Sequence, residues 1–253
     1  MGENMKNLMA HLVACYPDEK TSFLVAESLV EGGADILEVQ LPFSDPNADG
    51  PLIQNACSKM LDAGKTVQDG LNFIQKLHQS FPNVKIALMS YGSLVFTPGV
   101  ENFCQRAKNA GVDYMIIPDL PFDCDEGLSA SCKKNSMINV PVAAPDMSEQ
   151  RFTKMMSMDF PVIYAVLRSG ITGTATKVDE KTIRFLKRFR GDKKVEVYGG
   201  FGIQGAEQAS AISPYVDGVV AGSVFLKILE TTKSSRKLKK LIVEKVQEIK
   251  LSL

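Results

Sequence analysis

The chain has 253 residues, with 29 Lys and Arg against 29 Asp and Glu, a formal net charge of zero and 45% hydrophobic residues. Nucleic-acid binders usually carry a basic excess that supplies their phosphate contacts, so the balanced charge argues against a nucleic-acid partner. No apolar run approaches the roughly 18 residues needed to span a bilayer, and the N-terminal segment lacks a signal-peptide core, so we expect a cytoplasmic protein without membrane attachment.

Residues that bind metals or form disulfides are few. The five cysteines are odd in number and contain no C-x-x-C pair, so they fit neither a disulfide framework nor a zinc site. The chain has only two histidines, His11 and His78, which are too few for a histidine-rich metal site. We therefore expect reduced thiols, no metal and no cofactor on this chain.

Short apolar, β-branched runs recur along the whole sequence. They cover residues 8–15, 36–40, 85–90, 114–117, 139–142, 162–166, 195–198 and 218–220. Each run is nearly continuously apolar rather than alternating, which is typical of a strand buried on both faces of a parallel sheet.

Stretches with helical spacing of apolar residues lie between these runs, for example 21–31, 100–110 and 181–189. Gly33 and Gly111 stand where such helices would end in a left-handed turn. Eight buried strands alternating with helices over about 250 residues predict a (βα)8 TIM barrel. We expect a single domain over 1–253, with residues 1–7 frayed or foreign to it; a doubly wound open sheet is the structural alternative.

In such a barrel the active site lies at the C-terminal ends of the strands. Glu38 lies inside the second apolar run, where an unpaired carboxylate is costly to bury, so it is a candidate catalytic residue or else a core acid with a partner. Asp45 and Asp49 follow in a loop stiffened by Pro42 and Pro46. That loop could hold a carboxylate over the barrel mouth, although both aspartates could equally cap turns.

Glycine-rich loops follow the last three predicted strands. Residues 168–177 are small and hydroxyl-rich and predict a mobile lid after the sixth strand. The segments 199–203 and 221–223 each follow a strand and open a helix, where many barrels bind a phosphate. Residues 200–205 also spell G-x-G-x-x-G, but they come late in the chain and Asp217 has the wrong spacing for a dinucleotide fold, so we favour a monophosphate.

No lysine lies at the mouth end of a predicted strand, so a Schiff-base nucleophile is missing. Carboxylate acid–base chemistry on a phosphorylated small molecule is the function class that remains.

The run LEVQLPFSDPNADGPLIQ resembles the signature of tryptophan synthase α subunits. The segments GGADILE, VDYMIIPDLP, YAVLRSGITG, GGFGI and AGSVFLKILE are similar to that family in the same order. The resemblance implies a (βα)8 barrel that cleaves indole-3-glycerol phosphate to indole and glyceraldehyde 3-phosphate. It also implies an α2β2 heterotetramer for tryptophan biosynthesis, in which an allosterically coupled β subunit holds pyridoxal phosphate and receives the indole. Another phosphate-binding barrel isomerase or synthase would keep the glycine loops but has no reason to keep PFSDPNADGP.

The resemblance also assigns roles by position. Glu38 matches the general acid/base and Asp49 the carboxylate that holds the indole N–H. Tyr91, Tyr164 and Thr172 match family residues on the indole side. The residues that match the family's phosphate site are Gly173, Phe201, Gly202, Gly222 and Ser223. Pro42, Asp45 and Pro121 match positions where the family contacts its partner chain.

The chemistry fits two carboxylates, because cleavage needs the indole C3 protonated, its N–H polarised and a proton removed from the adjacent hydroxyl. We expect Glu38, in an apolar wall, to carry a proton near neutrality and Asp49, on a wetter loop, to stay ionised and stabilise the indolenine cation.

Several positions depart from the family pattern near the predicted pocket, among them Val13 and Cys15, which replace the Thr and Gly of a T-x-G, and Ser93, which replaces an Asn. His11 replaces an aromatic residue, Gln40 replaces a glycine, and Leu94 replaces a proline after the third strand. Because small positioning errors in a site cost large factors in rate, a second hypothesis is a catalytically impaired α chain that mainly activates a β subunit.

Overall fold

The structure is a computed structural model and describes residues 6–167, 178–191 and 195–253. Its described strands form one parallel sheet in the order β5-β4-β3-β2-β1-β9-β8-β7-β6. The strands are β1 (Asn7–Val13), β2 (Ile36–Gln40), β3 (Lys85–Met89), β4 (Tyr114–Ile116), β5 (Ile138–Asn139), β6 (Val142–Ala143), β7 (Val162–Val166), β8 (Glu196–Gly200) and β9 (Gly218–Ala221).

The two edges of this sheet are pieces of one extended segment, so the sheet closes into a barrel. β5 pairs with β4, and β6 pairs with β7. Val140 and Pro141 join β5 to β6. The Val140 N–H donates to the Met115 carbonyl on β4, and the Pro141 carbonyl accepts from the Tyr164 N–H on β7. These two hydrogen bonds continue the ladder on each side. The predicted strand 139–142 is therefore divided in two around Pro141, which has no N–H to donate. Closure confirms the barrel and excludes the open doubly wound sheet.

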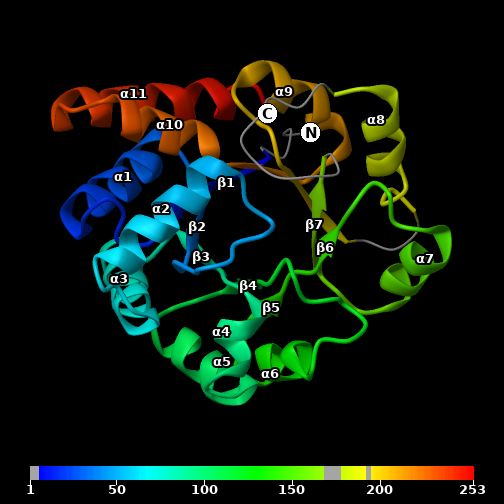
Figure 1. Ribbon diagram of the computed structural model, residues 1–253. Helices are drawn as coiled ribbons and strands as arrows, with labels where there is room; N and C mark the ends of the chain where they lie inside the picture. Colours follow the sequence, from blue (N-terminus) through cyan, green and yellow to red (C-terminus); the bar gives the residue numbers. More distant parts are fainter. Residues whose placement is uncertain (1–5, 168–177, 192–194) are drawn as a thin grey trace.

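Helices surround the strands as an outer ring (Figure 1). They are α1 (Glu19–Gly32), α2 (Pro51–Asp62), α3 (Val67–Ser80), α4 (Gly92–Phe96), α5 (Val100–Asn109), α6 (Leu128–Lys134), α7 (Glu149–Ser157), α8 (Glu180–Lys187), α9 (Ala206–Ile212), the 3-10 turn η1 (Ser213–Tyr215), α10 (Ser223–Thr231) and α11 (Ser235–Lys250). α11 packs along α1, as Figure 1 shows.

Local sequence sets the ends of α1. The Asp18 carboxylate accepts a hydrogen bond from the Thr21 N–H at the N-cap, and Gly33 closes the helix with φ 103°. The predicted helices 21–31, 100–110 and 181–189 are confirmed within two residues at their ends.

Alternate residues of each strand point into and out of the barrel, because side chains alternate across a strand. On β1, Met9 belongs to the interior apolar cluster, while Leu8 belongs to the layer between the strands and the helices. On β2, Ile36 likewise belongs to the interior cluster, and Leu37 belongs to the layer between the strands and the helices. Since both faces are apolar, the runs show no alternation in the sequence, and the polar residues that do point inward stand out.

Of the segment 1–7, expected to be frayed or foreign to the domain, residues 1–5 lie outside the described residues, and only its last residue is seen in a strand. Asn7 is the first residue of β1, and its side-chain amide donates to the Tyr198 hydroxyl at 2.8 Å. The lid predicted over 168–177 lies outside the described residues. Across 6–167, 178–191 and 195–253, none of the helices is long and apolar enough to cross a membrane.

Candidate active site

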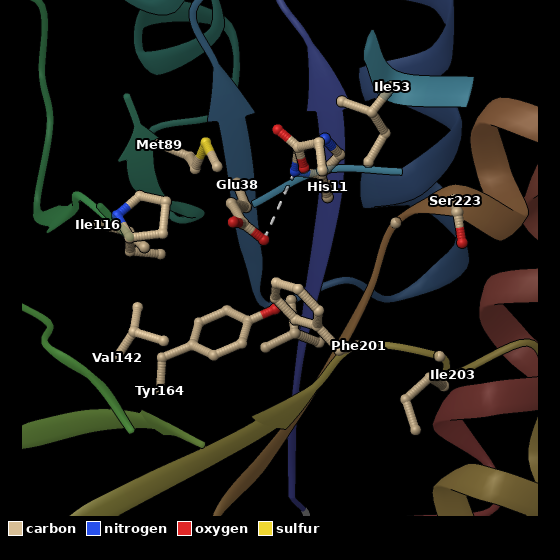
Figure 2. Close-up of a pocket in the computed structure, with 15 residues that line it drawn as sticks. His11, Glu38, Ile53, Met89, Ile116, Val142, Tyr164, Phe201, Ile203 and Ser223 are labelled. Atoms are coloured by element: carbon tan, nitrogen blue, oxygen red, sulfur yellow. Dashed lines mark ion pairs between the residues drawn. The ribbon is translucent and has the colours of Figure 1, made fainter. Parts of the chain in front are cut away.

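A pocket with about 570 Å³ of empty space opens at the C-terminal ends of the strands. Its lining comes from the strands β1, β2, β3, β4, β6, β7 and β9, from the loops after β2, β4, β8 and β9, and from α2 and the start of α10 (Figure 2). The lining residues are His11, Glu38, Asp49, Ile53, Met89, Ile116, Pro118, Val142, Tyr164, Phe201, Gly202, Ile203, Val220, Gly222 and Ser223.

Glu38 lies beside His11 inside the barrel, because the register of β1 and β2 pairs these two residues directly. His11 Nδ1 is 3.7 Å from Glu38 Oε2, and this contact is the dashed line in Figure 2. Both side chains are buried, and His11 Nε2 has no hydrogen-bond partner among the described residues. Burial alone lowers the pKa of His11, but the contact with Glu38 and the charges of Glu38 and Asp49 outweigh it, so the pKa is raised.

Asp49 lies at the end of the loop after β2 and is only 2% exposed. Its Oδ2 accepts hydrogen bonds from the Tyr91 hydroxyl and from Gln40 Nε2, both at 2.7 Å. Burial raises the pKa of Asp49, against the opposing effects of His11, Tyr91 and Gln40. The expectation of a wetter loop for Asp49 is therefore wrong, because two side chains from β2 and the end of β3 enclose it.

Gln40 fills space behind Asp49. It is fully buried, and its Nε2 lies 3.6 Å from the Cys57 thiol on α2 as well as against Asp49. Burial raises the pKa of Cys57 to about 11, so this neighbour is a neutral thiol. Gln40 thus supports the carboxylate with an uncharged donor rather than lining the pocket.

Tyr91 supports the same loop from the turn between β3 and α4, where it is the N-cap residue of α4. Its hydroxyl donates to Asp49 and accepts from the Ala48 N–H at 3.3 Å, and its ring stacks on Phe43 at 5.0 Å. Burial and the neighbouring Asp49 raise the pKa of Tyr91, so it remains a donor. Tyr91 was predicted to line the indole side, but in the described structure it lies behind Asp49 rather than among the lining residues.

Tyr164 extends from β7 into the apolar part of the pocket (Figure 2). Its ring meets that of Phe201 edge to face, with centroids 6.0 Å apart. Burial and the charges of Glu38 and Asp49 raise its pKa well above the usual value. Together with Ile116 and Val142, these rings make a flat-sided apolar space that suits an aromatic ligand.

The two glycine-rich loops form an adjoining wall, which Phe201 joins to the apolar part of the pocket. Phe201 and Gly202 adopt left-handed backbone, with φ 74° and 104°. Gln204 Nε2 donates to Ser223 Oγ at 3.1 Å and so links the loop after β8 to the start of α10. Gly222 precedes α10 and provides no side-chain cap, which leaves the first N–H groups of this helix without a side-chain acceptor.

Apart from Tyr91, which lies behind Asp49, the predicted residues separate into three groups. Glu38, Asp49, Tyr164, Phe201, Gly202, Gly222 and Ser223 line one pocket. Thr172 and Gly173 lie outside the described residues. Of the predicted interface residues, Asp45 and Pro121 are exposed, whereas Pro42 is buried.

Sequence reasoning missed most of the apolar lining. Ile53, Met89, Ile116, Val142 and Ile203 give no chemical signal in a sequence rich in such residues, and only their positions at or just after the ends of predicted strands, or on the helix after the second strand, could have indicated them. No group of three or more His, Cys, Asp or Glu side chains that could hold a metal ion occurs in the part of the chain that the structure describes.

A closed (βα)8 barrel with a pocket that joins two buried carboxylates to glycine-rich loops defines a barrel enzyme for a small, partly apolar substrate. The sequence model of the family described as tryptophan synthase alpha chain matches residues 1–252. The chain belongs to this family.

Relatives and solved structures agree with this assignment. The chain is similar to the tryptophan synthase alpha chain of Helicobacter hepaticus, with 36% identity over 227 residues that cover 88% of this chain and 85% of the relative. That of Carboxydothermus hydrogenoformans is 34% identical over 249 residues, which cover 97% and 93%. A structure from Aquifex aeolicus VF5 superposes with a TM-score of 0.87 at 32% identity, and Mycobacterium tuberculosis tryptophan synthase with 0.86 at 27%; each covers 98% of this chain and 93% of the matched one.

Proposed function

We propose that this chain is a lyase that cleaves indole-3-glycerol phosphate to indole and glyceraldehyde 3-phosphate, and that a β subunit receives the indole in the cytoplasm. The observation that carries the proposal is one pocket that brings Glu38 and Asp49 together with the apolar residues around Tyr164 and with the loops 201–203 and 222–223. The apolar residues are proposed to take the indole, the carboxylates to contact the hydroxyl-bearing three-carbon chain and the indole N–H, and the loops to take the phosphate.

Asp49 is proposed to accept the indole N–H. The hydrogen bonds from Tyr91 and Gln40 hold its carboxylate in place, and burial makes its charge more effective toward a cation that develops on the ring. Tyr164 and Phe201 hold the ring plane.

Glu38 is proposed to perform the proton transfers. Its carboxyl group first donates a proton to C3 of the indole, and the resulting carboxylate then takes the proton of the hydroxyl next to the indole as the C–C bond breaks. The electron pair of that bond returns to the indole ring, and Glu38 ends the step protonated again. One positioned carboxyl group contributes about 10² to 10⁴ in rate in such transfers. Ser223, Gly173 and the glycine backbone of the loops after β8 and β9 are proposed to bind the phosphate, and Thr172 is proposed to belong to the indole side.

All of these steps use side chains of this chain, and pyridoxal phosphate is proposed only on the β subunit. The exposed positions Asp45 and Pro121, on the loops after β2 and β4, are the proposed contact points of an α2β2 heterotetramer, and the buried Pro42 belongs to the loop of Asp45.

The test is indole release from indole-3-glycerol phosphate by the chain alone and mixed with a cognate β subunit. Release that increases with the β subunit and disappears in Glu38→Gln and Asp49→Asn supports the proposal. If there is no release while the chain still accelerates the β subunit's condensation of indole with serine, the chain is a regulatory subunit and the proposal is wrong.

A further inference from the structure

His11 is the polar lining residue that the two-carboxylate scheme does not use. It is 7% exposed, lines the pocket and leaves Nε2 buried without a hydrogen-bond partner in the described structure. An unpartnered buried ring nitrogen is costly and uncommon, so its position in the pocket favours a partner that comes from outside the chain, such as a ligand atom or a water.

The position of His11 indicates which part of a ligand it meets. On one side its Nδ1 faces Glu38 Oε2 at 3.7 Å. On the other side it touches the backbone of Gly222, since a Cβ on that glycine would lie 2.9 Å from His11 Cβ. His11 therefore lies between the proposed proton-transfer group and the start of the proposed phosphate loop.

Charge favours the same location. The titratable groups that face His11 from neighbouring elements are Glu38 on β2 and Asp49 on the loop after it, and both are acidic. Among the lining residues that the structure describes, His11 is the one side chain that can carry a positive charge. A protonated imidazole has two N–H donors, so one can face Glu38 while the other is available to a ligand oxygen.

We propose that His11 is a substrate-binding residue: its Nε2–H donates to an oxygen of the hydroxyl-bearing three-carbon chain next to the phosphate, while its Nδ1–H faces and orients Glu38. This inference rests on the proposed function for the identity of the ligand. It adds a polyol-recognising group to a site otherwise built from carboxylates and glycines.

The binding test uses two probes that differ only in hydroxyl groups, glycerol 3-phosphate and propyl phosphate, measured by calorimetry on the intact chain. His11→Phe keeps a ring but has no ring nitrogen. We expect it to weaken the binding of glycerol 3-phosphate by about 10-fold or more and to change the affinity for propyl phosphate by no more than about twofold. His11→Gln, whose amide reaches the Nε2 position, should recover part of the loss. His78→Gln on exposed α3 is the matched control and should bind both probes as the unchanged chain does.

A second measurement needs no substitution at His11. With only two histidines in the chain, the His11 imidazole can be followed by ¹⁵N NMR, using His78→Gln to assign it. Glycerol 3-phosphate should shift the Nε2 resonance more than Nδ1, and propyl phosphate should not. Equal effects of the two probes, or no shift at Nε2, overturn the inference even where His11→Phe folds poorly.

The kinetic test separates this inference from the proposed function. His11→Phe should lower kcat/KM for indole-3-glycerol phosphate by about 10- to 100-fold, and His11→Gln should restore KM more than kcat because it lacks the group that orients Glu38. If the unchanged chain releases indole and His11→Phe matches it, the inference fails alone. If the probes discriminate through His11 but no indole is released, the proposed function fails alone.

Discussion

The Tyr91 hydroxyl donates a 2.7 Å hydrogen bond to Asp49 Oδ2, although the two residues are 42 positions apart in the chain. The bond joins the end of β3 to the loop after β2 and holds a carboxylate that burial would otherwise penalise. The same hydroxyl accepts from the Ala48 N–H, so a single oxygen fixes both the backbone and the side chain of this loop.

Tyr91→Phe should destabilise the fold by about 1 to 3 kcal/mol, because it leaves the Ala48 N–H and one buried acceptor position of Asp49 unpaired while the Phe43 stacking is kept. The free energy of unfolding from urea titration at pH 7 measures the loss. Indole release should fall as well, since Asp49 is less well held. A variant as stable as the unchanged chain would show that the bond contributes nothing.

His11 predicts a pH dependence of stability. Its pKa in the folded chain is raised above the ordinary 6.5, so the folded state binds this proton more tightly than the unfolded state. The stabilisation is therefore fully present below pH 6.5 and is lost as the pH rises through the folded value, with a slope of at most about 1.4 kcal/mol per pH unit.

Urea titrations between pH 6 and 9 check this slope. His11→Phe should flatten the decline above pH 6.5, and His78→Gln should retain it. An unchanged decline in His11→Phe would assign the pH dependence to other groups.

The barrel could be predicted from the sequence because its strands are apolar on both faces and regularly spaced. The division of 139–142 and the pairing of each half with a different strand could not, because they depend on closing the ring at Pro141. Glu38 was detectable as a lone acid inside an apolar run, and the glycine loops by their position after strands.

The environment of Asp49 was not predictable. Its burial depends on Tyr91 and Gln40, which reach it only after β2 and β3 are aligned. The pairing of His11 with Glu38 likewise depends on the register of β1 and β2, which the apolar runs do not specify. Residue identity thus indicated which groups carry the chemistry, whereas strand register determines which groups meet.

Gly222→Ala tests the contact between the phosphate loop and His11. The new Cβ would lie 2.9 Å from His11 Cβ and 3.1 Å from its Cγ, so the imidazole or the loop must move. We expect a stability loss of about 1 to 3 kcal/mol and at least a tenfold loss of indole release. Gly191→Ala is the control, because a Cβ there meets nothing within 4 Å. Its free energy of unfolding should stay within about 0.5 kcal/mol of that of the unchanged chain. Equal behaviour of the two variants would show that the loop has room to spare.

Gln40→Glu tests why an uncharged donor supports Asp49. The change keeps the size of the side chain but replaces the Nε2 donor, 2.7 Å from Asp49 Oδ2, with a carboxylate oxygen. Two buried carboxylates this close cannot both ionise, so one must hold a proton to a higher pH. The free energy of unfolding should therefore be greatest at low pH and fall as the pH rises toward neutrality, and indole release should fall at least tenfold at pH 8 and recover partly toward pH 6.

Gln40→Ala removes the donor without adding a charge, so its loss of activity should not depend on pH in this way. Superimposable pH profiles for Gln40→Glu and Gln40→Ala would mean that Gln40 acts by filling space, not by donating to Asp49.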